Sequence, residues 1–256
     1  MKKEERQELI LNMLERDGQV TVNEIMHSLS VSDMTIRRDL NELALRGQLI
    51  RTHGGARPAA ALESGYERSH MEKKSLHKAE KKIIAQTAAA MIHDGETVFL
   101  GPGTTLEQLA VCLRERNIRV VTNSLPVFEI LKGSSSADLI LTGGEYRENT
   151  GAFIGTVAVR AIENMRFAKA FISVNGIAGG AVYTYSEEEG YIQKQALNNA
   201  AEKILLADSS KFNAYDFYEF YPLADFDHII TDSGLEGEVL TELKETADVR
   251  IAGDDR

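Results

Sequence analysis

Apolar residues recur at helical spacing near the start of the chain, and the clearest stripe follows residue 32. Its members, at i, i+4, i+7 and i+8, are Ile36, Leu40, Leu43 and Ala44. Steps of about 100° per residue place them on one face of a helix that packs against a core. Ser32 suits the N-cap, where its hydroxyl accepts from a free backbone N–H, and Gly47 suits the position past the last turn.

Two shorter patterns upstream predict two further helices. Thr21 and Glu24 have the T-x-x-E spacing of a capping box for a helix over residues 22–29, with Ile25 and Leu29 directed inward. The apolar residues of the earlier helix, which ends near residues 17–18, are Leu9, Ile10, Met13 and Leu14. Three helices in this order are typical of a helix-turn-helix module.

A basic, glycine-containing segment follows the third helix. Residues 49–55 end in Gly54 and Gly55, which predict the tight turn of a hairpin, so the module is expected to be a winged helix-turn-helix. The major groove of DNA admits one helix and presents acceptors suited to arginine. The residues expected to contact double-stranded operator DNA are Ser32, Met34, Thr35, Arg37, Arg38, Asn41, Arg51, His53 and Arg57.

An alternative is that the charged residues of the third helix form ordinary surface ion pairs. Asp33 with Arg37, and Arg38 with Glu42, have i, i+4 spacing, which stabilises a helix by ~0.3 kcal/mol per pair. Such pairs do not account for three capped helices, adjacent arginines and a basic hairpin within one short segment. The combination favours DNA binding.

The pattern changes to alternating strands and helices after residue 78. Short apolar runs predict strands at residues 97–100, 119–122, 138–141, 170–174, 204–207, 228–231 and 249–251. Helix-like or glycine-bearing stretches separate them, which indicates a mostly parallel sheet covered by helices. We therefore expect a winged helix-turn-helix domain at 1–57, a linker at 58–77 and an α/β effector-sensing domain at 78–256.

Charge is distributed unevenly between these parts. The chain of 256 residues has a net charge of −10, but residues 1–82 carry 15 Lys and Arg against 13 Asp and Glu. The remainder has 14 against 26, a net charge of −12. Contact with DNA phosphates is therefore expected only from the amino-terminal part.

Other features of composition exclude several classes of protein. The one cysteine, Cys112, cannot form an internal disulfide and is expected to be a buried, inert thiol. We find no metal-ligand cluster, no signal peptide and no apolar run long enough to span a membrane, and we expect no cofactor. The chain is expected to be cytoplasmic.

Glycine and polar residues follow five of the predicted strands. In open α/β sheets ligands bind beyond the carboxyl ends of the strands, and glycine turns before helices can hold phosphate oxygens. The residues expected to bind a small phosphorylated ligand are Gly101, Gly103, Thr104, Thr105, Asn123, Ser124, Gly143, Gly144, Arg147, Asn175, Gly176 and Lys211. Such residues also serve as ordinary turns and caps, and Glu187, Glu188 and Glu189 fit a first-turn preference rather than catalysis.

The assembled motifs resemble the DeoR family of bacterial regulators along nearly the whole chain. In the amino-terminal part the likeness lies in VSDMTIRRDL, residues 31–40, and HGGAR, residues 53–57. In the remainder it lies in GPGTT at 101–105, TNS at 122–124, TGGE-x-R at 142–147 and ADSSKF at 207–212.

The resemblance implies a winged-helix repressor joined to a sensor domain related to ribose-5-phosphate isomerase and CoA-transferase-like folds. It also implies a homo-oligomer and a phosphorylated sugar as effector. Within the family the chain is most similar to lactose phosphotransferase repressors, which implies tagatose 6-phosphate. Isomerases of the related fold use an acidic loop, whereas residues 174–178 here have no carboxylate, and Asn175 cannot act as a general base.

Two other functions remain open from the sequence. One is a sugar-phosphate isomerase-like enzyme with an accessory DNA-binding domain, which would turn over a sugar phosphate. The other is an activator, or a regulator that responds to a protein partner, which would leave the expected pocket without a small ligand.

Overall fold

A computed structural model describes residues 2–17, 20–46, 48–52, 54–58, 67–134, 138–235 and 237–253 of the chain. They divide into two compact units, Met1–Tyr66 and Glu67–Arg256. The predicted linker, residues 58–77, falls on both sides of this division, because residues 67–77 belong to the second unit. Within the described ranges, no helix combines the length and the apolar character needed to cross a membrane.

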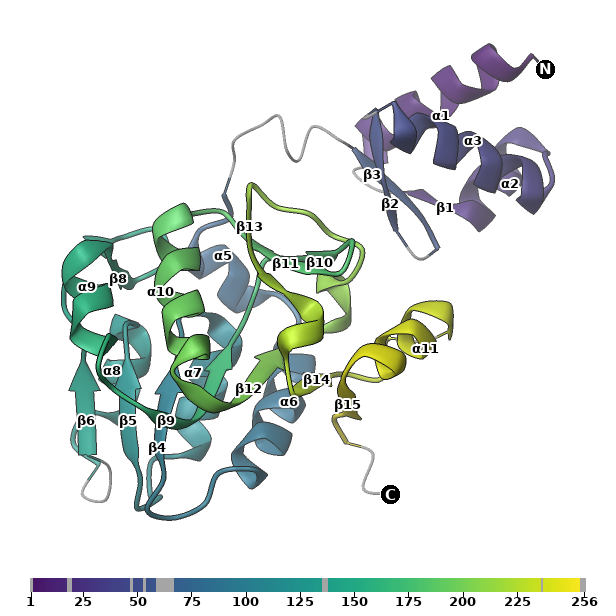
Figure 1. Ribbon diagram of the computed structural model, residues 1–256. Helices are drawn as coiled ribbons and strands as arrows, with labels where there is room; N and C mark the ends of the chain where they lie inside the picture. Colours follow the sequence, from purple (N-terminus) through teal and green to yellow (C-terminus); the bar gives the residue numbers. More distant parts are fainter. Residues whose placement is uncertain are drawn as a thin grey trace. The chain divides into compact units, whose positions relative to one another are not determined.

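Among its described residues, the first unit contains three helices and a small sheet (Figure 1). In chain order its elements are α1 (Lys3–Asp17), β1 (Val20–Thr21), α2 (Val22–Leu29), α3 (Asp33–Leu45), β2 (Leu49–Thr52) and β3 (Gly55–Pro58). The strands pair antiparallel in the order β1-β3-β2, so the predicted hairpin is present and joins the strand before α2. The architecture is the predicted winged helix-turn-helix.

The capping predictions for α2 and α3 have different outcomes. Thr21 accepts from the Glu24 backbone N–H at 3.1 Å, and the Glu24 carboxylate accepts from the Thr21 backbone N–H at 2.7 Å, which confirms the capping box. Ser32 occupies the N-cap of α3, but its side chain makes no cap hydrogen bond and lies 2.9 Å from the Thr35 hydroxyl instead. The expected Ser32 cap is therefore wrong, and Gly47 lies outside the described residues.

The apolar stripes of the three helices meet in one core. Its fully buried members include Ile10, Leu14, Ile25, Ile36, Leu40 and Leu43. Beside this core, Asp39 of α3 is 2% exposed and pairs with Arg6 of α1, whose Nη2 lies 3.1 Å from Asp39 Oδ1. This buried ion pair holds α3, the helix expected to contact DNA, against α1.

The second unit contains the parallel sheet that the alternation predicts. Its strands are β4 (Thr97–Leu100), β5 (Arg119–Thr122), β6 (Asp138–Leu141), β9 (Phe167–Ile172), β12 (Ala200–Leu206), β14 (His228–Thr231) and β15 (Asp248–Ile251). Their order is β15-β14-β12-β9-β4-β5-β6, and every pairing in this sheet is parallel. All seven strands therefore end at the same edge.

Helices cover both faces of this sheet (Figure 1). One face packs on α6 (Lys78–Ala90), α7 (Thr104–Cys112) and α8 (Leu125–Leu131). The other packs on α9 (Gly155–Ile162), α10 (Glu187–Asn198) and α11 (Gly237–Thr246). Because both faces are covered, consecutive side chains of the inner strands, such as β4, β5 and β9, are buried, which explains their unbroken apolar runs, whereas the edge strands β6 and β15 are partly exposed.

Several shorter elements were not predicted. The helix α5 (His70–Ser75) opens the second unit, with a capping box between Ser69 and Glu72. A hairpin joins β7 (Glu145–Arg147) to β8 (Ala152–Ile154), and a second sheet has the order β10-β11-β13, from Gly176–Ala178, Ala181–Thr184 and Tyr218–Pro222. Short 3-10 turns at Ser209–Lys211 and Leu223–Asp225 complete the second unit.

The prediction that Cys112 is buried is wrong. The residue is the last of α7, and its thiol is exposed. Partial desolvation still raises the pKa of this thiol, which favours its protonated, less nucleophilic form.

Candidate effector site and nucleic-acid interface

The outer face of α3 presents the side chains that the sequence assigns to DNA. Met34 is 81% exposed, the Arg38 side chain is 82% exposed, and Arg37 and Asn41 are exposed as well. Arg37 Nε lies 2.6 Å from the Asp33 carboxylate, and Arg38 Nε lies 3.6 Å from Glu42. Both i, i+4 pairs are therefore present, at exposed positions where such pairs stabilise little and exchange readily for other partners.

The wing is the β2–β3 hairpin, and fewer of its expected DNA-contacting residues are described. Arg51 on β2 is half-buried, and its Nη1 donates to the Gly55 carbonyl at 2.9 Å within the hairpin. Burial, followed by the positive charge of Arg37, lowers the pKa of Arg51, so the wing and the recognition helix place two cations near each other. His53, and the side chain of Arg57 on β3, lie outside the described residues.

A cavity of about 60 Å³ lies at the carboxyl edge of the parallel sheet, where the sequence places the effector. Of the expected residues it is lined by Gly103, Thr104, Thr105, Asn175 and Lys211. The loop after β4, the loop after β9 and the turn after β12 meet there. Ligand pockets usually enclose roughly 300–1,000 Å³, so this cavity is smaller than a typical ligand pocket.

Three lysine amines converge on this cavity. Lys73 comes from α5, Lys81 from α6 and Lys211 from the turn after β12. The Lys81 amine donates to the backbone carbonyls of Lys73 and Leu76 at 2.6 and 2.8 Å, and burial lowers its pKa to about 8. Burial also lowers the pKa of Lys211, against the charge of Asp208. A bound anion would stabilise the charged form of these desolvated amines.

The amino end of α7 forms another wall of the cavity. Gly103 has φ 134° and ψ 150°, and an added Cβ would lie 3.3 Å from Ser173, so the turn requires glycine. Thr104 and Thr105 are buried at the start of the helix, where free N–H groups attract anions. Residues 102–105 of the GPGTT segment therefore line the cavity, and their role in holding a phosphate stays a prediction.

Seven of the expected effector residues do not line the cavity. Most have structural roles: Asn123 donates to the Phe153 carbonyl at 3.0 Å, and Ser124 caps α8. They are Gly101, Asn123, Ser124, Gly143, Gly144, Arg147 and Gly176. Gly144 and Gly176 permit close backbone packing, since an added Cβ would lie 2.5 Å from the Ile154 carbonyl oxygen and 2.1 Å from that of Ala214.

Arg147 supports the site from outside the cavity. Its guanidinium pairs with the Glu67 carboxylate at the start of the second unit and lies 3.3 Å from Glu189 Oε1. Burial disfavours the charged form of Arg147 and acts to lower its pKa. The carboxylates of Glu67 and Glu189 outweigh this effect, so the pKa of Arg147 is raised. The Glu67 carboxylate also accepts from Asn149 and lies 3.8 Å from the Lys73 amine.

The cavity also contains groups that the sequence analysis missed. They are His70, Lys73, Lys81, Pro102, Thr150, Ser173, Val174, Thr184, Glu189 and Gln193. Lys81 had a usable signal, because it lies one turn before Ile84 on the buried stripe of α6, where a lysine needs a reason. Glu189 corrects the interpretation of residues 187–189: unlike its two neighbours it is buried, and it accepts from Thr150 and Arg147.

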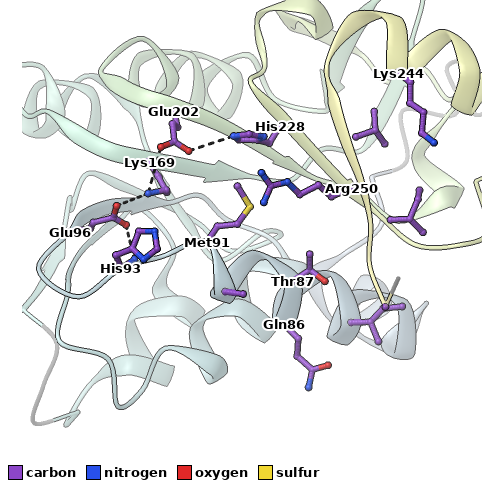
Figure 2. A pocket seen from close by; sticks show the side chains of 15 residues that line it. Gln86, Thr87, Met91, His93, Glu96, Lys169, Glu202, His228, Lys244 and Arg250 are labelled. Atoms are coloured by element: carbon purple, nitrogen blue, oxygen red, sulfur yellow. Dashed lines mark hydrogen bonds and ion pairs between the residues drawn. The ribbon is translucent and has the colours of Figure 1, made fainter. Parts of the chain in front are cut away.

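A larger cavity, of about 990 Å³, lies at the amino-terminal ends of the same strands (Figure 2). Its charged groups satisfy one another: Lys169 pairs with Glu96 at 2.5 Å and with Glu202 at 3.7 Å, and Glu202 lies 3.5 Å from His228. Its position at the amino-terminal edge of the sheet distinguishes it from the carboxyl-edge cavity, which is lined by three lysines and by the amino end of α7. We therefore regard the carboxyl-edge cavity as the candidate effector site.

Comparison with known protein families gives two matches. Residues 6–60 match the DeoR-like helix-turn-helix domain, and residues 76–233 match the DeoR C-terminal sensor domain.

Three similar curated proteins share one name. A lactose phosphotransferase system repressor of Lactococcus lactis subsp. lactis is 52% identical over 96% of this chain and 97% of its own length. The repressor of the same name from Streptococcus mutans serotype c is 47% identical over 91% of this chain and 93% of its own. That of Staphylococcus aureus (strain NCTC 8325) is 42% identical over 94% and 96%.

Solved structures resemble only part of the chain. Ribose 5-phosphate isomerase A from Methanocaldococcus jannaschii matches with a TM-score of 0.39 and 17% identity, over 53% of this chain and 54% of its own. eIF2B beta from Chaetomium thermophilum matches with a TM-score of 0.43 and 16% identity, over 59% and 48%.

Proposed function

The chain belongs to the DeoR family, and from this premise we propose that it represses lactose phosphotransferase genes and leaves its operator when a phosphorylated sugar binds. The proposed effector is tagatose 6-phosphate. The single observation that carries the ligand class is the convergence of the Lys73, Lys81 and Lys211 amines beside the amino end of α7. The lactose assignment rests on the names of the similar repressors.

The DNA-binding part of the proposal rests on α3. Arg37 and Arg38 would contact base edges in the major groove, with Met34 and Thr35 beside them. Ser32, Asn41, Arg51, His53 and Arg57 would position the module on the sugar-phosphate backbone. Two or more copies of the chain would bind together, because a single three-helix module covers one half-site.

The position of α5 in the chain provides a route by which ligand binding would be coupled to DNA binding. Lys73 donates to the Asn175 side chain at 3.1 Å, and α5 begins shortly after the division between the two units at residues 66–67. A phosphate that takes over the Lys73 amine would break this contact. A ligand can switch the repressor only by favouring one such arrangement over the other.

The pocket does contain a carboxylate, but its surroundings do not favour isomerase chemistry. Glu189 is held by Arg147 and the Thr150 hydroxyl, and Asn175, which the family resemblance places at the acidic loop of the related isomerases, has no carboxylate. We propose that the site binds sugar phosphates without turning them over. Incubation of the purified chain with aldose and ketose phosphates, followed by analysis of the sugars, would reveal turnover if the enzyme alternative were correct.

Titration calorimetry tests the effector proposal. Tagatose 6-phosphate should bind the full chain saturably, and tagatose without phosphate should not. Lys81→Met should lower the affinity at least tenfold, since a charge-assisted hydrogen bond contributes about 1.5–3 kcal/mol. Lys78→Met is the matched control, because Lys78 is exposed on the same helix. Equal affinities of the two variants for the sugar phosphate would contradict the assignment.

A further inference from the structure

One wall of the candidate effector cavity presents no lysine amine. It is formed by α10, which contributes Glu189 and Gln193, together with Thr150 and Thr184. These side chains carry hydroxyl, amide and carboxylate groups rather than amines. Their chemistry matches the hydroxyl groups of a sugar, which donate and accept hydrogen bonds.

Gln193 is the group on this wall that lacks a partner. The residue is 2% exposed and lies on the buried face of α10, one turn after Glu189 and one turn before Ala196 and Leu197. Its Oε1 is buried and has no hydrogen-bond partner among the described residues. A buried acceptor left in this state costs free energy, so each one in a native fold requires an explanation.

The other amide side chains of the same segment make hydrogen bonds within the fold. Gln195 donates to Asn199 at 3.3 Å, Asn198 accepts from the Tyr221 hydroxyl at 3.1 Å, and Asn199 donates to the Ile162 carbonyl at 2.7 Å. Each of these holds part of the fold together. The Gln193 Oε1 makes no such contact among the described residues, and Gln193 is the amide of this helix that lines the cavity.

We propose that Gln193 is the specificity-determining residue of the effector site, and that it accepts a hydrogen bond from a hydroxyl group of the bound sugar phosphate. Glu189, at i−4 on the same helix face, presents a second acceptor nearby, so the α10 wall offers two acceptors to a polyhydroxylated ligand. The ligand class is a phosphorylated polyol or sugar rather than inorganic phosphate. This inference rests on the proposed function, since it assigns a second role within the same site.

The test compares Gln193→Met with Gln195→Met in the full chain. Methionine keeps the length of glutamine and removes its polar atoms. Gln195 lies on the same helix, away from this cavity, and serves as the matched control. Calorimetry with tagatose 6-phosphate, with its C4 epimer fructose 6-phosphate and, by competition, with inorganic phosphate gives three affinities for each protein.

Gln193→Met should weaken binding of tagatose 6-phosphate about tenfold, the loss of one net hydrogen bond, and should change affinity for inorganic phosphate less than twofold. It should also reduce the ratio between the two epimers, if wild type distinguishes them, while Gln195→Met matches wild type. Unchanged tagatose 6-phosphate affinity, or an equal loss for inorganic phosphate, would overturn the assignment of Gln193.

Gln193→Asn provides a second variant should the methionine protein fail to fold, because it keeps the amide and withdraws it by one methylene. It should show the same selective loss, and thermal melting establishes that each variant is folded. If wild type binds neither sugar phosphate, the proposed function itself fails. If wild type binds and both Gln193 variants bind equally well, only the inference about Gln193 fails.

Discussion

Replacing Glu67 with glutamine should destabilise the second unit, because this carboxylate anchors its first residues. The Glu67 side chain is 5% exposed and accepts from both terminal nitrogens of Arg147 and from Asn149. Breaking a buried ion pair costs about 3–5 kcal/mol when one charge remains without a partner. Here Arg147 keeps Glu189 at 3.3 Å and is itself partly exposed, so we expect a loss of about 2 kcal/mol.

Urea denaturation of the full chain measures this loss through the unfolding transition of the second unit. For a unit of this size, a loss of 2 kcal/mol also lowers the melting temperature by about 4–8 °C. Glu129→Gln is the control, since Glu129 pairs with Lys132 at 3.3 Å on the surface, where such a pair contributes at most about 1 kcal/mol. If Glu67→Gln and Glu129→Gln unfold at the same urea concentration, the anchoring role of Glu67 is refuted.

Three further predictions concern the DNA-binding unit and the pocket amines. Asp39→Ala removes the 2%-exposed carboxylate that accepts hydrogen bonds from Arg6 and Gln7, and should destabilise the first unit by about 2–3 kcal/mol, the contribution of hydrogen bonds to a charged group. Circular dichroism and DNA binding should show the loss while sugar-phosphate binding persists. Lys81 has a lowered pKa of about 8, so its charged form is depleted as the pH rises through 8. The affinity for the effector should therefore fall between pH 7 and 9 in a pH series of calorimetric titrations. Lys81→Arg should flatten that fall, because arginine stays charged. Arg38→Ala should weaken binding to selected duplexes more than to bulk DNA in competition assays, and equal losses would reduce Arg38 to a phosphate contact.

The stability of the second unit should itself depend on pH through Lys81. A folded-state pKa below the unfolded value means that the unfolded chain binds the extra proton. This contribution opposes folding below pH 8 and is relieved as the pH rises from 8 towards 10.5, the ordinary value. A bound phosphate should reduce this dependence, because it stabilises the charged amine in the folded state.

The elements that the sequence predicted well are those whose signals are local. The capping box of Thr21 and Glu24 and the stripe through Ile36 and Leu40 are fixed by spacing within one helix. The parallel strands could be predicted equally well, because burial of the inner strands on both faces leaves unbroken apolar runs in the sequence. The small β10-β11-β13 sheet was missed because it is completed by β13, which pairs with β11 from a distant segment that local spacing cannot identify.

The candidate site was harder to predict, because its residues come from distant segments. GPGTT, Asn175 and Lys211 could be placed from the rule that ligands bind at the carboxyl ends of strands. Arg147 follows the same rule but is held outside the cavity by Glu67, a partner 80 residues earlier in the chain. Lys73 was assigned to a linker, and only its contact with Asn175 brings it into the pocket.

The central claim is that one molecule reads DNA with α3 and senses a phosphorylated sugar beside Lys81. Fluorescence anisotropy tests it directly, with a labelled duplex that the full chain has selected from a random-sequence library and a titration of tagatose 6-phosphate into the complex. We predict saturable release of the duplex by the sugar phosphate, with tagatose without effect and with a higher concentration required for Lys81→Met. A complex that stays intact while calorimetry shows the sugar phosphate bound would contradict the claim.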